Sequence, residues 1–459
     1  MHLSKAKCNY AGLTPPIEGK MKITNSLKMQ DRGRKRIPGM TQLLSKRPDM
    51  FSEGVWPGYY SKAKGAEVWD LDNNRYIDMS ISGIGANILG YADPDVNEAV
   101  ISAIQNGSSS SLNSYEEVEL ADLLCELHPW ADMVRFARCG GEAMSVAVRI
   151  ARAHTGKDKI AFCGYHGWHD WYLSANLNTG NELDNHLITG LIPNGVPKGL
   201  ANTAFPFQYN RIDELKKIIE KHGKDLAAIV MEPVRSEQPV PGFLEEIRSL
   251  ADKMGAVLII DEVSAAFRTN VGGAHLDYNL VPDMAVFSKA IGNGYPIAAI
   301  IGKEDVMQSA QNTFISSTMW TERVGPVASL ATIKKYKDLD AHKHLIAIGN
   351  AVQKGWKNQA QKNNIDLSVA TGMAPLCHFS FNYPDMLDIK SYFIQLMVDR
   401  GFLASNLFYA MYAHKMEHVE KYLHAVGESF SIISKDIDSG KFKKNMRGRP
   451  SGAGFKRLS

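Results

Sequence analysis

Two side chains stand at the ends of apolar segments, where buried strands often present groups that do chemistry. Lys289 follows the run Met284–Phe287, and the turn-forming residues Gly292, Gly294 and Pro296 come shortly after it. Burial of a lysine amine disfavours its charged form and prepares it to attack a carbonyl carbon. Taken alone, a lysine at the end of a strand more often simply reaches solvent. A second residue favours the chemical interpretation.

Asp261 stands 28 positions earlier, at the end of the apolar segment that begins at Ala256. Parallel strands joined by a crossover bring their carboxyl ends to one edge of a sheet, so we expect Asp261 and Lys289 to meet there. A carboxylate can keep a pyridinium nitrogen protonated while a lysine amine holds an aldehyde carbon. These two functions are what pyridoxal 5'-phosphate (PLP) requires, and the pair therefore predicts a PLP site.

A glycine pair precedes both strands. Gly140 and Gly141 open an alanine-rich helical segment after the short apolar run 133–137. Backbone amides at such a turn, with the positive end of the helix behind them, can bind an anion. An ordinary strand-to-helix turn has the same appearance, and the position of the glycines ahead of Asp261 and Lys289 favours the anion site.

The loop 164–170 contains Tyr165, His166 and His169. Its aromatic rings could simply fill a core. Two histidines could also suggest a metal, but no carboxylate or cysteine pattern completes a ligand set, and we predict no metal site.

The order of the segments predicts an α/β protein with a mostly parallel, doubly wound sheet. Residues 67–78 alternate and turn at Asp72–Asn74, which predicts a β-hairpin with Asn73 or Asn74 in the turn. Residues 1–50 look irregular, and their basic cluster Arg32–Arg36 favours a solvated arm over a nucleic-acid contact. A long loop is expected over 179–208, and residues 441–459 are expected to be loosely held. Strands are expected over 133–137, 159–162, 225–234, 256–261, 284–287, 367–369 and 377–381, and helices over 96–105, 114–127, 140–152, 212–222, 242–254 and 324–336.

These spaced motifs together resemble the class III aminotransferases of PLP fold type I, over about residues 55–435, and most closely their glutamate-1-semialdehyde aminomutase branch. The resemblance implies an N-terminal arm and part of a small α+β domain at 1–85, a large PLP-binding domain at 86–336, and the rest of the small domain at 337–459. It also implies roles for single residues. Lys289 and Asp261 would be catalytic, and the cofactor would be bound by Gly140, Gly141, Tyr165, Glu232, Asp261, Val263, Lys289 and Thr318.

Two of these roles concern the cofactor phosphate. The family usually has Ser-Gly-Thr-Glu-Ala where this chain has Cys139-Gly-Gly-Glu-Ala143, so a hydroxyl that binds phosphate is missing and amides would carry that contact. The resemblance places Thr318 on the phosphate of a neighbouring subunit. It therefore implies a homodimer with shared active sites.

The chain departs from the aminomutase branch at two places. That branch has an arginine near its N-terminus that grips the substrate carboxylate, and Lys46-Arg47 matches its spacing poorly. The segment 404–414 has aromatic residues, including Phe408 to Tyr412, in place of a glutamate, which predicts an aromatic and polar pocket. We therefore expect a transaminase that moves an amino group from an amino-acid donor to a carbonyl acceptor, such as a sugar-derived one. An aminomutase and a non-catalytic regulatory protein of the same fold are the alternatives.

Composition narrows the class of protein. The net charge of +3 gives no reason to expect a nucleic-acid partner, and no apolar run is long enough for a membrane span. The five cysteines are scattered and odd in number, and the first eight residues lack the apolar core of a signal peptide. We expect a cytoplasmic enzyme.

Overall fold

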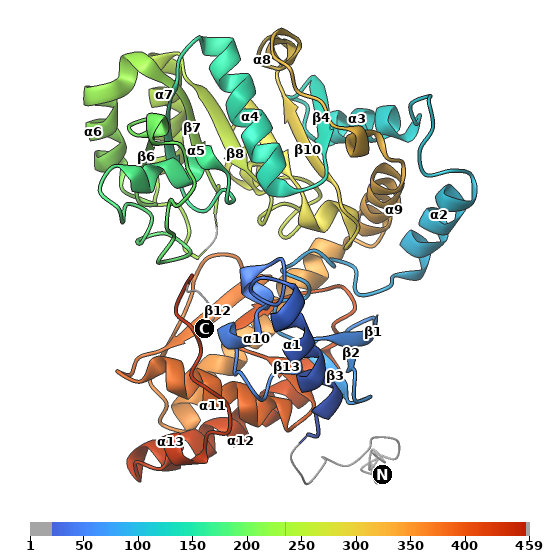
Figure 1. Ribbon diagram of the computed structural model, residues 1–459, viewed down its shortest axis with the longest axis vertical. Helices are drawn as coiled ribbons and strands as arrows, with labels where there is room; N and C mark the ends of the chain where they lie inside the picture. The colour runs from blue at the N-terminus through green and yellow to red at the C-terminus, as the bar shows by residue number, and fades with distance from the viewer. Residues whose placement is uncertain (1–20, 235, 456–459) are drawn as a thin grey trace, which may run out of the picture.

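The computed structural model describes residues 21–234 and 236–455, in two lobes (Figure 1). The upper lobe contains a seven-stranded sheet, and the lower lobe contains a four-stranded and a three-stranded sheet. The N-terminal segment up to residue 20, with Cys8, lies outside the described residues. The predicted domain boundaries at 85/86 and 336/337 stay predictions.

The seven-stranded sheet has the order β4-β10-β9-β8-β7-β5-β6. Strands β9, β8, β7, β5 and β6 pair in parallel, while β10 runs antiparallel to both of its neighbours. The expected mostly parallel α/β sheet is therefore confirmed. Its strands are β4 (Met133–Ala137), β5 (Lys159–Cys163), β6 (Ala204–Pro206), β7 (Leu226–Met231), β8 (Val257–Asp261), β9 (Met284–Phe287) and β10 (Ala298–Gly302).

Helices cover both faces of this sheet, because successive side chains of a buried strand point to opposite sides. In β8, Val257 and Ile259 pack toward the face covered by α4, whereas Leu258 and Ile260 join the core on the other face. The helices of this lobe are α2 (Pro94–Gln105), α3 (Glu116–Leu127), α4 (Gly140–Thr155), α5 (Asp170–Leu173), α6 (Ile212–His222), α7 (Phe243–Met254), α8 (Glu304–Met307) and α9 (Val324–Asp338).

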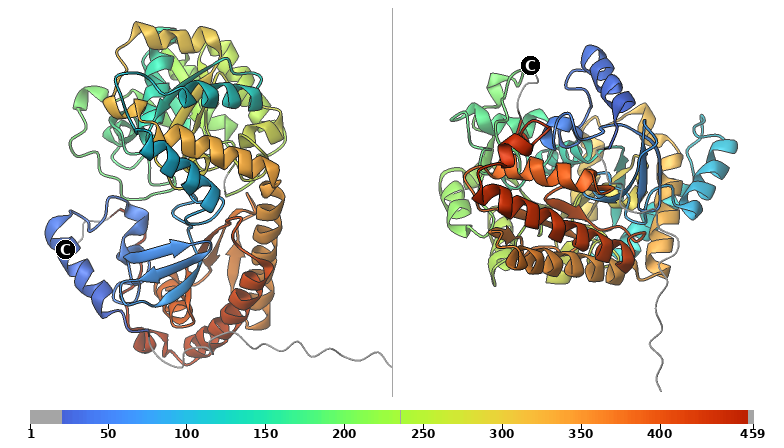
Figure 2. Two further views of the ribbon diagram at one scale, coloured as in Figure 1. Left: turned by 90° about the vertical axis from the view of Figure 1, so that its right-hand side faces the viewer. Right: turned by 90° about the horizontal axis from the view of Figure 1, so that it is seen from below.

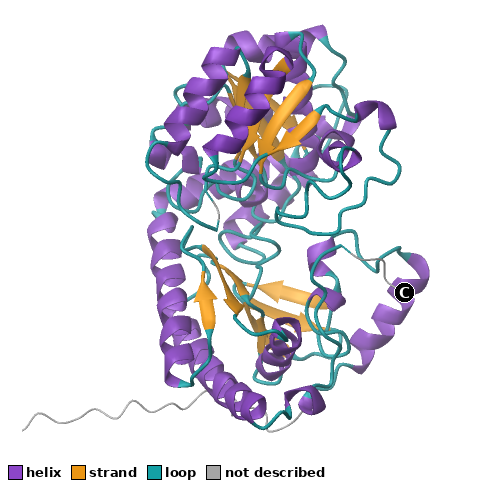
Figure 3. Cartoon of the chain, turned by 90° about the vertical axis from the view of Figure 1, so that its left-hand side faces the viewer, coloured by secondary structure: helices purple, strands orange, loops and turns teal. Residues whose placement is uncertain are grey.

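The lower lobe combines both ends of the chain. Strand β13 pairs in parallel with β3, which joins the C-terminal part to the N-terminal hairpin. Figure 2 shows the N-terminal strands beside the C-terminal helices, and Figure 3 shows long helices on the outside of the lobe. The elements are α1 (Thr24–Arg36), β1 (Tyr60–Lys64), β2 (Glu67–Asp70), β3 (Arg75–Met79), α10 (Ala341–Lys362), β11 (Leu367–Val369), β12 (Leu376–Phe381), α11 (Met386–Val398), β13 (Phe402–Ala404), β14 (Leu407–Tyr409), α12 (Met416–Asp438) and α13 (Phe442–Asn445).

The predicted hairpin is confirmed. β2 and β3 pair antiparallel, and Asn73 takes the left-handed conformation at the turn, with φ of 65°. Asparagine tolerates this conformation better than most residues.

The predicted irregular arm is wrong for residues 24–36, which form α1. The helix is held by Gln30, whose side-chain amide donates to the carbonyl oxygens of Trp56 and Pro57 at 2.9 and 3.0 Å. The basic cluster forms its last turn, where cations interact favourably with the negative end of the helix. The helix depends on these tertiary contacts, which cannot be predicted from the local sequence pattern.

The predicted loose tail is also wrong for residues 441–455. Ser451 is only 4% exposed, and its hydroxyl lies 2.9 Å from that of Ser391. The Gly452 amide donates to the Asp49 carbonyl at 2.7 Å, and the Phe455 amide donates to the Thr189 carbonyl at 2.9 Å. The tail therefore bridges the N-terminal segment and a loop of the upper lobe.

The expected long loop over 179–208 is mostly irregular, with β6 as a short edge strand. Among the described residues, no helix combines the length and the apolar character that crossing a bilayer requires.

Candidate active site

The sheet brings Asp261 and Lys289 to the same edge. Asp261 is the last residue of β8 and lies opposite Val286 of the parallel strand β9. Lys289 follows Val286 by three residues and begins the 3-10 turn Lys289–Gly292. Its φ of 47° lies in the left-handed region, an uncommon conformation for a non-glycine residue and typical of functional turns. The expected meeting of the two strand ends is thus present.

A serine contacts the lysine amine. Lys289 Nζ donates a hydrogen bond to Ser264 Oγ at 2.6 Å. The Ser264 carbonyl in turn accepts from Nε of Arg268 at 3.2 Å. Arg268 is only 1% exposed, and burial lowers its pKa to about 10. Sequence reasoning missed Ser264, although its place three residues after Asp261 was a usable signal.

Asp261 is held by two donors. It is 4% exposed, and its Oδ1 accepts from the Val263 amide at 3.0 Å. Its Oδ2 lies 2.8 Å from Nδ1 of His166, while Nε2 of the same ring lies 3.0 Å from the carbonyl of Cys163. Both ring nitrogens face oxygen acceptors, so both hydrogen bonds form only when His166 carries two ring hydrogens. The ring therefore fixes the orientation of the buried carboxylate.

The neighbouring acid, Glu262, has a different place. It is fully buried, and its Oε1 accepts from the amide and from Nδ1 of His275 at 2.8 and 2.7 Å. His275 Nε2 accepts from the Trp130 indole at 3.0 Å. Glu262 therefore belongs to a structural network, and Asp261 stays the predicted acid of the site.

The predicted anion site lies at the start of α4. The first-turn amides of a helix have no acceptor within the helix, so Gly140 and Gly141 can offer theirs to a ligand. Glu142 closes the turn from behind by accepting from the Cys139 amide at 3.1 Å. A Cβ on Gly140 would stand 2.9 Å from a methyl carbon of Val263. Glycine at 140 therefore lets this turn pack directly against the residues that follow Asp261.

Tyr165 and Glu232 flank this region. Tyr165 is half-buried and packs edge-to-face on Tyr172, with ring centroids 5.7 Å apart. Glu232 follows β7 and is 7% exposed. A Cβ on Gly164 would lie 2.9 Å from Glu232 Oε2, and the φ of 116° at Gly164 also demands glycine. The loop with Tyr165 thus starts directly beside this acid.

Thr318 lies apart, at the start of the 3-10 turn Thr318–Thr321. It is exposed, as are its neighbours Phe314 and Met319, at 86% and 59%. The role expected for it on a neighbouring subunit stays a prediction.

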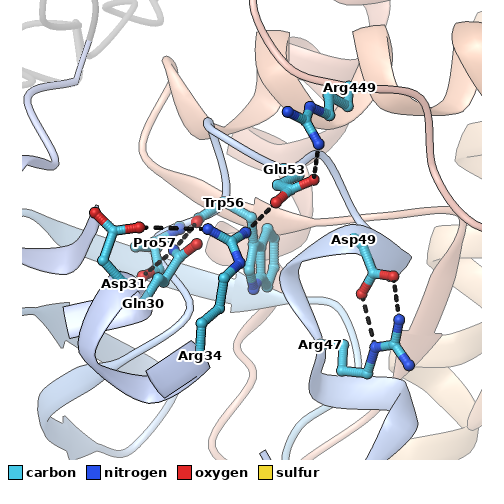
Figure 4. Close-up of polar contacts among 9 residues, drawn as sticks. All are labelled: Gln30, Asp31, Arg34, Arg47, Asp49, Glu53, Trp56, Pro57 and Arg449. Carbon is cyan, nitrogen blue, oxygen red and sulfur yellow. Dashed lines mark hydrogen bonds and ion pairs between the residues drawn. The ribbon is translucent and has the colours of Figure 1, made fainter. Parts of the chain in front are cut away.

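The N-terminal cation candidate is already bonded to an acid (Figure 4). Arg47 is 5% exposed, and its Nε donates to Asp49 Oδ1 at 2.9 Å, with a second bond from its terminal nitrogen to Oδ2. The same figure shows Arg34 and Arg449 both directed at Glu53. Lys46, beside Arg47, is exposed.

The aromatic pocket expected at 408–412 is wrong for Phe408. Its ring is fully buried in the main hydrophobic core, because β14 pairs with β12 there. Tyr412 packs on the ring of His344, with centroids 5.0 Å apart. Tyr409 does approach the site, since a Cβ on Gly85 would lie 3.4 Å from its ring and 2.6 Å from Arg268.

The residues present fit PLP. One sheet edge carries a lysine amine, a buried aspartate with a histidine partner, and a helix start with glycines. These can hold an aldehyde carbon, a ring nitrogen and a phosphate respectively. One nitrogen beside the helix start, His169 Nδ1, is buried without a hydrogen-bond partner in the described part of the chain.

Comparisons with known proteins agree with this geometry. The family model described as "Aminotransferase class-III" matches residues 52–405. A 3-aminobutyryl-CoA aminotransferase from Cloacimonas acidaminovorans is 36% identical over 323 residues, which cover 69% of this chain and 73% of the relative.

Solved structures share the fold. The FumI protein of Sphingopyxis sp. MTA144, solved with PLP, has a TM-score of 0.81 and 25% identity, covering 93% of this chain and 99% of its own. An omega-transaminase from Sphaerobacter thermophilus has a TM-score of 0.79 and 24% identity, over 89% of this chain and 98% of its own.

Proposed function

Because the chain belongs to the class III aminotransferase family, and is a PLP-dependent transaminase, we propose that its acceptor is a short 3-oxoacyl thioester of coenzyme A. The donor is an ordinary amino acid such as glutamate or alanine. The observation that carries this proposal is the 36% identity to a 3-aminobutyryl-CoA aminotransferase over 69% of the chain.

The Arg47–Asp49 pair supports this choice of acceptor. A carboxylate substrate needs a cation, and a bidentate arginine is the best partner for it. Here the Arg47 guanidinium already forms two bonds to Asp49. A thioester masks the acid of the substrate and has no need of that cation. The same pair disfavours the aminomutase alternative, in which an arginine near the N-terminus grips the substrate.

The structure gives no support for a sugar-derived acceptor. It was based on an aromatic lining over 408–412, and Phe408 is in the core instead. A non-catalytic regulator is also disfavoured, since both Lys289 and Asp261 are present at one sheet edge.

The residues divide the work as follows. Lys289 would hold the aldehyde carbon of the cofactor through its amine, which the amine of the substrate would release. Lys289 Nζ then takes the proton from the substrate carbon that bears the nitrogen, and Ser264 Oγ steadies this amine. When bound, the cofactor would supply a protonated ring that takes up the electron pair of the broken C–H bond. Asp261 would keep that ring protonated, and His166 holds the Asp261 carboxylate in place.

The proposal includes a homodimer with shared sites. Thr318 is exposed on a segment whose apolar neighbours, Phe314 and Met319, also face outward. Exposed apolar side chains next to an expected ligand contact favour cover by a second copy of the chain. We also place the enzyme in the cytoplasm, which the free thiols of the four described cysteines support.

The test follows a nitrogen label. Wild-type enzyme receives 15N-glutamate or 15N-alanine with 3-oxobutyryl-CoA, or with free 3-oxobutyrate as the matched acid. We expect label in 3-aminobutyryl-CoA and much less in the free amino acid. Asp49→Asn removes the charged partner of Arg47 seen in the structure and should move the preference toward the free acid. Equal use of both acceptors, or donor-free conversion of glutamate-1-semialdehyde to 5-aminolevulinate, would overturn the proposal.

A further inference from the structure

Gly141 leaves space at the point where the family usually has a hydroxyl side chain. The residue lies in the first turn of α4, and its φ is not in the left-handed region, so the backbone does not require glycine there. A Cβ built on Gly141 would stand 3.2 Å from both Nδ1 and Cε1 of His169. The imidazole therefore occupies the volume that a Ser or Thr side chain at 141 would use.

The nitrogen in that volume is unusual. His169 Nδ1 is shielded from solvent and has no hydrogen-bond partner within residues 21–234 and 236–455. Leaving a buried polar nitrogen without a hydrogen bond costs free energy. An unpaired nitrogen at a candidate site therefore indicates that a bound ligand supplies the partner. Burial lowers the pKa of His169, which favours the neutral ring with one N–H to donate.

The ring is also held in place. It stacks on Trp168, with centroids 4.3 Å apart and planes inclined by 27°. The backbone carbonyl of His169 accepts from the amides of Tyr172 and Leu173 at 3.0 and 3.1 Å, which anchors the residue at the start of α5. A donor fixed in this way loses little freedom when a ligand binds.

We propose that His169 donates a hydrogen bond from Nδ1 to the cofactor phosphate, in place of the hydroxyl that Gly141 lacks. The two positions form one unit: glycine at 141 makes room for the imidazole, and the imidazole restores the lost donor. This inference rests on the PLP assignment, and it adds a phosphate-binding residue to it.

The first experiment measures cofactor affinity without turnover. Apo enzyme, prepared by removing the cofactor, is titrated with PLP and, separately, with pyridoxal, which lacks the phosphate. His169→Phe keeps a ring but removes the donor, and should weaken PLP binding about tenfold to a hundredfold, the range for a hydrogen bond to a charged group. Pyridoxal binding should stay within about twofold.

Two further variants separate the donor from the ring. The amide nitrogen of His169→Asn stands near the Nδ1 position and should recover much of the affinity. His222→Phe is the matched control, because His222 is also a half-buried histidine stacked on an aromatic ring, that of Phe205 at 4.2 Å. It should bind PLP as the wild type does. The 31P resonance of bound PLP should move in His169→Phe and not in the control.

The second experiment uses the steric conflict. Gly141→Ser alone places a Cβ 3.2 Å from the imidazole and should weaken PLP binding, because ring or turn must shift. In the His169→Ala background the same substitution has room and supplies a hydroxyl, so it should strengthen PLP binding over His169→Ala alone.

The outcomes separate this inference from the function. If wild-type apo enzyme fails to bind PLP, the proposed function fails with it. If the wild type binds PLP and His169→Phe binds it equally well, or loses PLP and pyridoxal to the same extent, the phosphate contact is refuted and the transaminase assignment stands. The phosphate contact is also refuted if Gly141→Ser changes PLP affinity equally in the wild type and in His169→Ala.

Discussion

The hydrogen bond from His166 to Asp261 gives a prediction whose size follows from the structure. His166→Phe keeps a planar ring of similar volume among Phe162, Trp171 and Tyr172 and removes both nitrogens. Asp261 then loses its 2.8 Å charge-assisted bond and keeps the one from the Val263 amide. Bonds of this kind to a charged group contribute about 1.5–3 kcal/mol. That range corresponds to roughly a tenfold to hundredfold loss in kcat/KM.

The assay compares steady-state kcat/KM of the purified variant with that of the wild type at saturating PLP. Thermal unfolding of both proteins shows whether the fold has survived. His186→Phe serves as the matched control, because the ring of His186 also packs on Phe162, with centroids 5.9 Å apart, while Asp261 bonds to His166. The control should lose little activity. Near-normal kcat/KM in His166→Phe, or an equal loss in both variants, would refute the role given to the His166–Asp261 pair.

Three further experiments test the rest of the site. Asp261→Asn should keep the shape of the side chain and lose its charge. The activation barrier should rise by about 3 kcal/mol, which lowers kcat roughly a hundredfold. Normal turnover would mean that Asp261 has only a structural role. Gly140→Ala should lower the free energy of unfolding in urea by about 1–3 kcal/mol, because its Cβ meets Val263. Adding Val263→Ala should recover part of this loss. An unchanged urea midpoint in Gly140→Ala would contradict the close packing of the two residues. Inactive Lys289→Ala and Thr318→Ala subunits, when mixed, should regain activity at the one site that carries neither lesion, and no recovery after verified subunit exchange would place the site within one chain.

The sheet and the position of Asp261 and Lys289 at one edge of it could be predicted because their sequence signals are local. Runs such as Val257–Asp261 and Met284–Phe287 are wholly apolar, as strands buried on both faces must be. Side chains that follow such strands must lie at one sheet edge, so the meeting of Asp261 and Lys289 follows from topology alone.

The partners of those residues could not be predicted in the same way. His166 and Ser264 act through contacts across 95 and 25 residues, which no periodicity reports. The place of Phe408 also depends on tertiary structure. From the sequence, an aromatic residue in a short strand could line a pocket or lie in the core. Phe408 lies in the core because its strand, β14, pairs with β12.

The two ends of the chain show the same limit. Polar residues around Arg34 indicate a solvated segment. Helix α1 is nevertheless held, because the Gln30 side-chain amide donates to backbone carbonyls 26 and 27 positions away. The Gly- and Arg-rich tail is held by backbone hydrogen bonds, which depend little on side-chain type.

The central claim is that Lys289 carries the cofactor, and one measurement tests it directly. Purified enzyme loaded with PLP is reduced with borohydride, digested, and searched by mass spectrometry for the lysine that bears the pyridoxyl group. We expect the label on the peptide that contains Lys289, and no fixed label in Lys289→Ala. Recovery of the label on a different lysine of the wild-type enzyme would contradict the account.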